Sequence, residues 1–451
     1  VELATRRKDL ENNLARLYQE VITKKTWLKL SENATPTVRA ALEKYRAAIV
    51  RIGKGTGKRA PRYRREAQEA SEQASAAIPC WIMPHYRISE SLPANFGSFD
   101  LVIIDEASQS DLTALPALLR AKKVLVVGDD KQVSPDTVGL KEDKIKDLMN
   151  QYLADQVKLY RSQLSPDRSI YDLFKVVFAG SSVMLKEHFR CAPAIIEFSK
   201  REFYDHELKP LRKSKPSERL DPPLIDVHVT DGHRNTKGVN LPEARFIIDE
   251  IKKIVEDPVY VGRTIGVISL LGNYQSREIM EMLSRELGEK AITDFDIACG
   301  DARTFQGKER DIMFLSLLVS PGDAHALTTE SFAQRINVAA SRARDRMYLV
   351  RSIELDELSQ ADVYRSKLIQ HFKQPFMQDE EQVDDLRSKC ESAFEIEVFD
   401  ILVERGYRVI PQVEVGQYRI DMVVEGEDDN SLAIECDGDR YHGPDKWESD
   451  I

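Results

Sequence analysis

From about residue 99 onward, the chain alternates short apolar runs rich in β-branched residues with longer amphipathic stretches. The apolar runs are "LVII", "KVLVV", "LIDVHV", "TIGVISLL", "DIMFLSLLV" and "RMYLV", and "LPEARFIIDEIKKIVED" is one of the amphipathic stretches between them. Strands that are buried on both faces give such continuous apolar runs, because the intervening helices cover both faces of a parallel sheet. The pattern therefore predicts an α/β fold.

The first 50 or so residues show a helical pattern instead. Leu3, Leu10, Leu14, Leu17 and Val21 fall near helical spacing, and "TPTVRAALEKYRAAIV" opens with a proline where a helix start tolerates it. We therefore expect two helices in this region. Their spacing does not decide between a protruding stalk and a packed helical hairpin.

A polar segment, "KQPFMQDEEQVDDLRSK", separates this body from a small α/β tail, and we interpret residues 373–388 as a linker. The tail opens with a helix that carries Glu395 and Glu397, followed by a strand that ends in "YRID", a turn, and a strand "LAIECDGD". This order brings Asp421 and Glu435 onto neighbouring strands. Two carboxylates at one point favour a divalent cation between them, because otherwise they repel each other.

Charge is distributed unevenly along the 451 residues, whose formal net charge is -10. Residues 389–451 hold 17 acidic and 6 basic side chains, a net of -11. The rest of the chain therefore holds 59 basic and 58 acidic side chains, a net of +1. The body is thus neutral enough to carry a local basic groove for nucleic acid, and the length favours two or three domains.

The cysteines and the apolar segments indicate the cellular compartment in which the protein is expected. The five cysteines form no CxxC pair and no spacing typical of metal ligands, so we expect reduced thiols, mostly in the core. No apolar stretch approaches 18 uninterrupted residues, and "VELATRRKDLENN" is not a signal peptide. We therefore expect a cytoplasmic protein.

Two adjacent acids, Asp105 and Glu106, follow the apolar run in "FDLVIIDEASQSD". An unpaired charge at the mouth of a hydrophobic strand is costly, and ligands in open α/β sheets bind beyond the carboxyl ends of the strands. One acid can hold Mg²⁺ there while its neighbour orients or deprotonates a water. The next apolar run ends in "GDDKQVSP", which predicts that Gln132 lies in a second loop at the same sheet edge.

Together, "DEASQ" and "GDDKQVSP" resemble motifs II and III of the superfamily 1 helicases. The resemblance continues in order: "EHFRCAPAIIEFS" resembles motif IV of the Upf-like branch, "DARTFQGKERDIMFLSL" resembles motif V, and "QRINVAASRARDRMYLV" resembles motif VI. Five motifs in the correct order make a chance agreement remote. The resemblance implies two RecA-like domains that close on ATP, at residues 61–180 and 181–372, with residues 1–60 as a helical stalk or insertion of the first domain.

The resemblance also implies roles for individual residues. Asp105 would ligate Mg²⁺, Glu106 would position the attacking water, and Gln132 would sense the γ-phosphate. Arg190 and Arg342, from the second domain, would neutralise the charge that develops during phosphoryl transfer. The remaining residues implied are Gln306, Gly307 and Glu309 at the nucleotide and Thr304 at the nucleic acid.

A glycine-rich stretch at residues 51–66, "RIGKGTGKRAPRYRRE", looks like a phosphate-binding loop but does not match GxxxxGK[ST]. Ile52 stands at the position of the first glycine, and Arg59 at the position of the hydroxyl residue. We interpret the stretch as a basic connector that contacts a phosphate backbone through residues such as Lys58 and Arg59, or as a plain solvated loop. In superfamily 1 helicases the P-loop precedes the paired acids, so the resemblance implies a fragment that hydrolyses no ATP by itself.

The tail resembles the PD-(D/E)xK nucleases, in particular the branch near the very-short-patch-repair endonucleases, which shares "DG" followed by an aromatic residue and a histidine. The resemblance implies a nuclease domain at residues 389–451 with Asp421, Glu435 and Asp437 as metal ligands. Asp437 stands where the general motif has lysine, so His442 is expected to assist instead. A decayed nuclease fold that only binds nucleic acid remains the alternative for this domain.

These observations predict an ATP-dependent helicase or translocase coupled to a DNA endonuclease, with a setting in restriction of foreign DNA or in repair. The expected cofactors are ATP and Mg²⁺, with Mn²⁺ as a second candidate at the nuclease site. The expected partner is nucleic acid, DNA in preference to RNA, and not a membrane. The alternative function is an ATPase switch that binds and remodels nucleic-acid complexes without unwinding.

Overall fold

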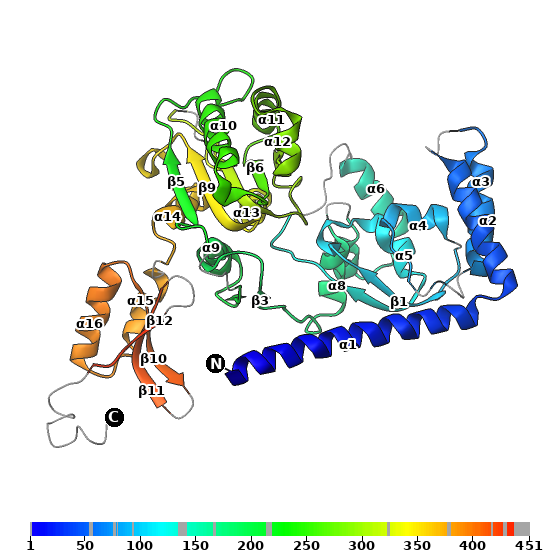
Figure 1. Cartoon of the computed structure of the whole chain (residues 1–451), viewed down its shortest axis with the longest axis horizontal. Helices are drawn as coiled ribbons and strands as arrows, with labels where there is room; N and C mark the ends of the chain where they lie inside the picture. Colours follow the sequence, from blue (N-terminus) through cyan, green and yellow to red (C-terminus); the bar gives the residue numbers. More distant parts are fainter. Residues whose placement is uncertain are drawn as a thin grey trace. The chain divides into compact units, whose positions relative to one another are not determined.

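The computed structural model divides the chain into two compact units (Figure 1). The first consists of Val1–Asp130 with Ser134–Ser182, and the second consists of Lys131–Val133 with Val183–Ile451. The residues that the structure describes are 2–53, 57–74, 78, 80–92, 94–133, 142–165, 168–212, 219–322, 325–376, 380–415, 418–426 and 431–436.

Helices α1 (Glu2–Asn33) and α2 (Pro36–Ile52) confirm the two helices predicted at the start of the chain. The hydroxyl of Thr35 accepts a hydrogen bond from the backbone N of Val38 at 3.3 Å, which caps α2. Helix α3 (Ala60–Ala74) packs against α2 (Figure 1). Their buried side chains are mostly alanines, which let two helices approach closely: Ala41 and Ala48 on α2, and Ala67, Ala70 and Ala74 on α3.

This hairpin corrects the prediction of a basic connector at residues 51–66. The chain is helical again from Ala60, so Arg62, Arg64 and Arg65 lie on α3 rather than in a loop. Arg62 also forms an exposed ion pair with Glu66, one helical turn later, at 2.9 Å. The alanine spacing was the helical signal, and the basic residues between the alanines obscured it.

The first unit also contains a parallel strand pair, β1 (Phe99–Ile104) and β2 (Ala121–Val126). One face of this pair packs on a small core that includes Ile104 and Ile170, whereas Leu101 and Ile103 are exposed. Ser169 and Asp172 form a capping box at the start of α8. The other helices of this unit are α4 (His85–Ser91), α5 (Leu115–Leu118), α6 (Glu142–Tyr152), α7 (Lys158–Gln163) and α8 (Ile170–Val177).

The second unit is built on a five-stranded sheet in the order β5-β9-β8-β6-β7, with every neighbouring pair parallel. The predicted parallel sheet is therefore confirmed. Its strands are β5 (Leu224–His228), β6 (Ile265–Ser269), β7 (Ala298–Asp301), β8 (Arg310–Ser316) and β9 (Ala343–Arg351). Its helices are α9 (Pro193–Phe203), α10 (Leu241–Glu256), α11 (Tyr274–Glu286), α12 (Gly288–Asp294), α13 (Glu330–Ala340) and α14 (Val363–Lys373), and a short pair, β3 (Glu187–His188) and β4 (Lys209–Pro210), lies outside the sheet.

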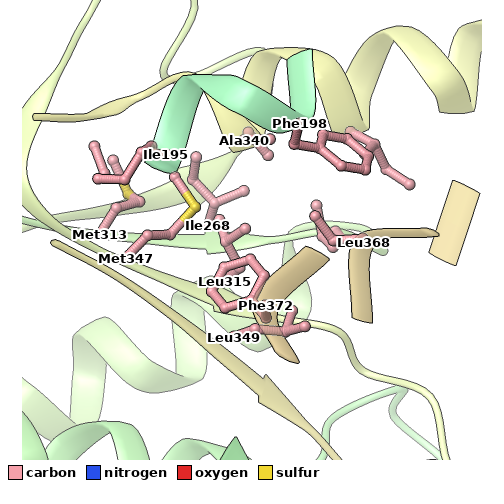
Figure 2. Packing of buried hydrophobic residues seen from close by; sticks show 14 of the residues in the cluster. Ile195, Phe198, Ile268, Met313, Leu315, Ala340, Met347, Leu349, Leu368 and Phe372 are labelled. Atoms are coloured by element: carbon pink, nitrogen blue, oxygen red, sulfur yellow. The ribbon is translucent and has the colours of Figure 1, made fainter. Parts of the chain in front are cut away.

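Alternate residues of the central strands contribute side chains to two separate hydrophobic cores, one on each face of the sheet. Met313 and Leu315 of β8 pack with α9, α13 and α14 on one face of the sheet, as Figure 2 shows in part. Ile312 and Phe314 pack with α10 and α11 on the other face. Because side chains alternate across a strand, a strand buried on both sides must be apolar at every position. This explains the uninterrupted run "DIMFLSLLV".

Glu243, in the first turn of α10, is a fully buried acid within this fold. Its carboxylate accepts hydrogen bonds from the hydroxyls of Ser316 at 2.6 Å and Ser352 at 2.8 Å, and from the backbone N of Leu318 at 3.2 Å. Burial raises the pKa of Glu243 to about 7, although the three hydrogen-bond donors lower it. The sequence pattern did not distinguish this acid from the solvated acids of an amphipathic helix.

Replacing Glu243 by Gln is expected to change how stability depends on pH. The folded-state pKa of about 7 lies above the ordinary value of 4.5, so the contribution of this group to stability is present below about pH 4.5 and is lost as the pH rises to about 7. Glutamine does not titrate, so the stability of Glu243→Gln relative to the unaltered protein should rise by up to about 3 kcal/mol across that window. Urea unfolding at pH 5 and pH 7.5 measures this difference, and an identical pH dependence of the two proteins would contradict it.

The tail consists of two helices and an antiparallel sheet in the order β10-β11-β12. The elements are α15 (Glu380–Arg387), α16 (Ala393–Glu404), β10 (Arg408–Val415), β11 (Tyr418–Glu425) and β12 (Ser431–Ile434). Phe399, Val409 and Met422 form its buried core. Arg408, at the start of β10, is buried and pairs with Glu197 of α9, which ties the tail to the body of the second unit.

Two predictions about this region need correction. The single strand that was predicted to end in "YRID" is a hairpin of β10 and β11, so Asp421 lies inside β11 rather than at a strand end. The predicted linker contains α15, whose Val383 and Leu386 pack on the core of the tail. Its many acids made the segment look like a solvated linker, although two apolar residues three positions apart form one helical face.

The described part of the chain also shows the state of the cysteines and whether any helix could span a membrane. All five cysteines are free thiols; Cys191 is buried and Cys80 is exposed. Among the helices that the structure describes, none combines the length and the apolar character needed to cross a bilayer.

Candidate functional site

The paired acids Asp105 and Glu106 directly follow β1 at its carboxyl end, and both side chains are exposed. The carboxylate of Asp105 accepts a hydrogen bond from the backbone N of Glu106 at 2.9 Å, and Gln109 donates its side-chain amide to Glu106 at 2.8 Å. Glu106 has a φ of 51°, in the left-handed region that non-glycine residues rarely adopt. Strained residues of this kind cluster at functional sites, and the geometry leaves both acids open to a ligand.

The second predicted loop lies beside these acids in the same unit. The backbone N of Ala107 donates to the carbonyl oxygen of Val127 at 2.8 Å, and the backbone N of Asp129 donates to the hydroxyl of Ser108 at 3.4 Å. Gly128 is required for this close approach, because a Cβ at that position would lie 3.0 Å from the backbone N of Ser108. "DEASQ" and "GDD" therefore meet at one sheet edge, as predicted.

Arg342 lies between the end of α13 and the start of β9 and is almost fully buried. Its guanidinium donates a hydrogen bond to the side-chain oxygen of Gln132 at 2.9 Å. The same segment is held by Asn337, which donates its side-chain amide to the carbonyl oxygen of Lys131 at 2.8 Å. Residues of motifs III and VI, about 200 positions apart, are thus brought into direct contact.

Arg190 and Glu309 form an ion pair at 2.6 Å. Glu309 also pairs with Arg344 at 3.3 Å, so one carboxylate lies between two guanidinium groups. Arg190 donates a further hydrogen bond to the carbonyl oxygen of Ser341 at 3.4 Å. Residues of motifs IV, V and VI therefore converge beside the amino ends of β8 and β9.

His188 lies next to this arginine cluster and remains uncharged. Burial, followed by the positive charge of the neighbouring Arg190, lowers its pKa to about 4. Its Nε2 accepts a hydrogen bond from the backbone N of Cys191 at 3.0 Å. A neutral imidazole can accept such a bond, whereas an imidazolium cannot, so His188 shapes the loop that carries Arg190 without adding charge to it.

The other predicted residues of motif V lie near these groups. Gln306 donates its side-chain amide to the carbonyl oxygen of Val133 at 3.4 Å, and Gly307 has a φ of 71° that suits glycine. The hydroxyl of Thr304 donates to the carboxylate of Asp301 at 2.7 Å.

Lys58 and Arg59, the predicted phosphate contacts, are exposed just before α3, in the other unit.

In the tail, Asp421 and Glu435 lie on neighbouring strands, as predicted. Met422 of β11 pairs with Ile434 of β12, so the next residues in register are Asp421 and Glu435. The carboxylate of Asp421 accepts a hydrogen bond from the backbone N of Cys436 at 2.8 Å. Burial, followed by the charge of Asp421, raises the pKa of the Cys436 thiol to about 11. The predicted residues Asp437 and His442 lie outside the described residues.

The donors at these sites suit hard divalent cations. Mg²⁺ and Mn²⁺ prefer oxygen ligands, and Asp105 in the first unit and Asp421 with Glu435 in the tail offer carboxylates. Within the described ranges, no group of three or more His, Cys, Asp or Glu side chains is close enough to hold a metal ion. The described carboxylates are therefore the kind of ligand that Mg²⁺ and Mn²⁺ prefer. A complete metal site in the tail needs further oxygen ligands.

Family models match the regions that contain these motifs. Two models described as "AAA domain" match residues 85–138 and 167–354, and a model described as "REase_MTES_1575" matches residues 394–451. These matches show that the chain contains Upf-like helicase domains of superfamily 1. The first two matches contain helicase motifs II to VI, and the third coincides with the tail, which is a restriction-endonuclease-like domain.

Curated relatives of this chain agree with that assignment. "Helicase sen1" of Schizosaccharomyces pombe is 28% identical over 272 residues, which are 57% of this chain and 15% of that protein. "Uncharacterized ATP-dependent helicase MG140" of Mycoplasma genitalium is 24% identical over 63% of this chain and 27% of that protein. "5'-3' DNA helicase ZGRF1" of Mus musculus is 28% identical over 56% of this chain and 13% of that protein. The chain thus matches roughly a quarter or less of each relative.

Two solved structures also align with part of this chain. An arterivirus nonstructural protein 10 helicase in complex with DNA covers 55% of this chain and 38% of its own, at 13% identity and a TM-score of 0.27. The C-terminal domain of a possible DNA helicase from Lactobacillus plantarum covers 40% of this chain and 96% of its own, at 15% identity and a TM-score of 0.23.

Proposed function

We propose that the protein is an ATP-driven helicase or translocase that acts on nucleic acid, and that its tail is a metal-dependent DNA endonuclease. The observation that carries the proposal is the convergence of motifs III to VI in the second unit, where Arg342 holds Gln132 and Arg190 holds Glu309. Convergence of distant segments is what an ATP site needs, because its catalysis rests on positioning and on electrostatic stabilisation.

The paired acids take different roles in this proposal. Asp105 would hold Mg²⁺, and the ion, when bound, neutralises charge on the nucleotide phosphates. Glu106 would orient the attacking water, and its left-handed backbone together with the hydrogen bond from Gln109 fixes the direction of its carboxylate. A carboxylate that is exposed and held at one oxygen keeps its other oxygen available for that water.

The arginines would act on the phosphates. Arginine stays ionised and presents a planar fork that fits phosphate oxygens. Arg190 is paired with Glu309 at 2.6 Å, so a nucleotide phosphate can replace that carboxylate as its partner. Arg342 is oriented through Gln132, which would couple the residue that senses the γ-phosphate to the arginine that stabilises the transition state. Gln306 and Gly307 shape the loop beside them.

DNA is the favoured nucleic acid. ZGRF1, one of the relatives, is named as a DNA helicase, and the tail resembles nucleases that act on DNA. Thr304, Lys58 and Arg59 are the proposed contacts to the strand, the two basic residues through its phosphates. Restriction of foreign DNA or DNA repair would use a motor and a nuclease in one chain.

In the tail, Asp421 and Glu435 would hold Mg²⁺ or Mn²⁺ together with Asp437, and His442 would assist in place of the missing lysine. A bound divalent cation lowers the pKa of its water toward neutrality. The register that pairs β11 with β12 supports this proposal, because it brings the first two carboxylates next to each other.

In the full-length protein, replacing Asp421 by Ala is expected to abolish metal-dependent DNA cleavage and to leave ATP hydrolysis unchanged, because the two sites use different residues. Cleavage of supercoiled plasmid with Mg²⁺ or Mn²⁺ and ATPase assays on the same preparations measure the two activities. Asp400→Ala is the matched control, because Asp400 is a half-buried acid of the same domain whose carboxylate pairs with Arg387. Cleavage that survives Asp421→Ala would contradict the nuclease assignment.

A further inference from the structure

Gln412 of β10 adopts a conformation that its position does not explain. Its φ is 55°, in the left-handed region that favours glycine. Its neighbours Pro411 and Val413 pair with Met422 and Ile420 of β11, so Gln412 lies directly opposite Asp421. Left-handed non-glycine residues persist where the surrounding structure imposes them, and they cluster at functional sites.

The side-chain amide of Gln412 has a fixed orientation. Its Nε2 donates a hydrogen bond to Glu395 Oε2 at 2.8 Å, and the buried Glu395 also accepts from the backbone N of Glu391 at 2.9 Å. A carboxylate without a proton can only accept hydrogen bonds, so Glu395 holds the NH₂ end of the amide and turns the oxygen away.

That oxygen, Gln412 Oε1, is buried and has no hydrogen-bond partner among the described residues. Buried polar atoms are nearly always satisfied, and an exception calls for an explanation such as a bound ion. If Gln412 only tied β10 to α16, its bond to Glu395 would suffice. A purely structural role explains neither the orphan oxygen nor the left-handed backbone.

The neighbours of Gln412 indicate what the oxygen faces. Gln412, Asp421 and Glu435 occupy one row across β10, β11 and the end of β12. Residues that are directly opposite on neighbouring strands have their Cβ atoms about 5 Å apart. Three oxygen-bearing residues in one row suit a hard divalent cation, and a neutral amide adds a ligand without adding repulsion between carboxylates.

We propose that Gln412 Oε1 is an oxygen ligand of a divalent-cation site that it forms with Asp421 and Glu435, and that Glu395 is the positioning residue that aims the Gln412 amide at the cation. This inference rests on the proposed nuclease function of the tail. It adds two residues that the helicase and nuclease motifs do not contain, and it supplies the further oxygen ligand that the two described carboxylates need.

Mn²⁺ binding, measured by isothermal titration calorimetry on the 451-residue chain without nucleotide, tests the proposal apart from activity. The binding that Asp421→Ala removes defines the tail site. Gln412→Gly should weaken that binding at least 10-fold, in the range for loss of a group that supports a metal site. Its melting temperature should not fall, because glycine adopts the left-handed conformation freely. Glu395→Gln frees the amide to rotate and should also weaken binding, whereas the control Asp400→Asn should bind Mn²⁺ normally.

The outcomes separate this inference from the nuclease proposal. Loss of Mn²⁺ binding in Asp421→Ala, with unchanged binding in Gln412→Gly, would overturn the inference and leave the nuclease proposal standing. An unaltered chain that binds no Mn²⁺ at the tail and cleaves no DNA would overturn both. If Gln412→Gly unfolds, Gln412→Asn replaces it, because asparagine tolerates the left-handed region but is one methylene too short to reach both Glu395 and the cation.

Discussion

The variant Glu106→Gln is expected to lose ATP hydrolysis by about 10²- to 10⁴-fold, the range for removal of a group that handles a proton or positions a water. The amide cannot accept the proton of the attacking water, and its NH₂ group cannot take the place of the second carboxylate oxygen. ATP binding should persist, because Asp105 remains to hold the metal. Turnover and nucleotide affinity of the full-length protein, measured separately, check this expectation.

Asp100→Asn provides the control for that experiment. Asp100 is an exposed acid on the same strand, where it pairs with Lys122 at 2.8 Å, away from the carboxyl end. Its variant should hydrolyse ATP at the normal rate. Normal turnover in Glu106→Gln itself would remove the paired acids from the catalytic mechanism.

The second large effect is expected for Arg342→Ala, which should lower turnover by about 10³-fold, the low end for an arginine that stabilises phosphoryl transfer. Arg190→Ala should have a similar effect. Arg342→Lys keeps the charge but loses the planar fork, so it should restore little activity. Steady-state ATPase kinetics measure these losses, and circular dichroism shows whether the variants are folded.

A substitution of Arg346 in β9 is the control that distinguishes a loss of catalysis from a loss of stability. Like Arg342 it is buried, but it donates hydrogen bonds to the carbonyl oxygens of Asp221 and Pro222 and to the hydroxyl of Tyr260. Arg346→Lys should therefore reduce thermal stability more than turnover. A loss of only a few fold in both Arg342→Ala and Arg190→Ala would instead assign those arginines to salt bridges and packing.

The apolar patterns predicted the central sheet because its strands are buried on both faces. Four consecutive residues of β8, Ile312 to Leu315, enter the two cores alternately, so their burial is visible as an unbroken apolar run. Strand β7 (Ala298–Asp301) was missed because it is short and lies at the edge of the sheet. The hairpin of β10 and β11 was missed because alternation continues through "VEVGQYRI", where Gly416 was the one signal of a turn.

The motifs predicted which residue types belong to the sites but not their partners. Arg190 meets Glu309, and Arg342 meets Gln132, across separations of 119 and 210 positions that no local pattern encodes. The left-handed backbones of Glu106 and Gln412 depend on tertiary packing, because neither residue type favours that conformation. The sequence placed Glu395 on a helix, but its role became visible only through its contact with Gln412.

Strand displacement tests the central claim, that the protein is an ATP-driven helicase, most directly. The full-length protein is mixed with a fluorescently labelled DNA duplex that carries a single-stranded tail, and release of the labelled strand is followed with and without ATP. We predict release that requires ATP and that Glu106→Gln abolishes. ATP hydrolysis that is stimulated by DNA, with no strand released from duplexes tailed at either end, would contradict the claim and identify the protein as an ATPase switch.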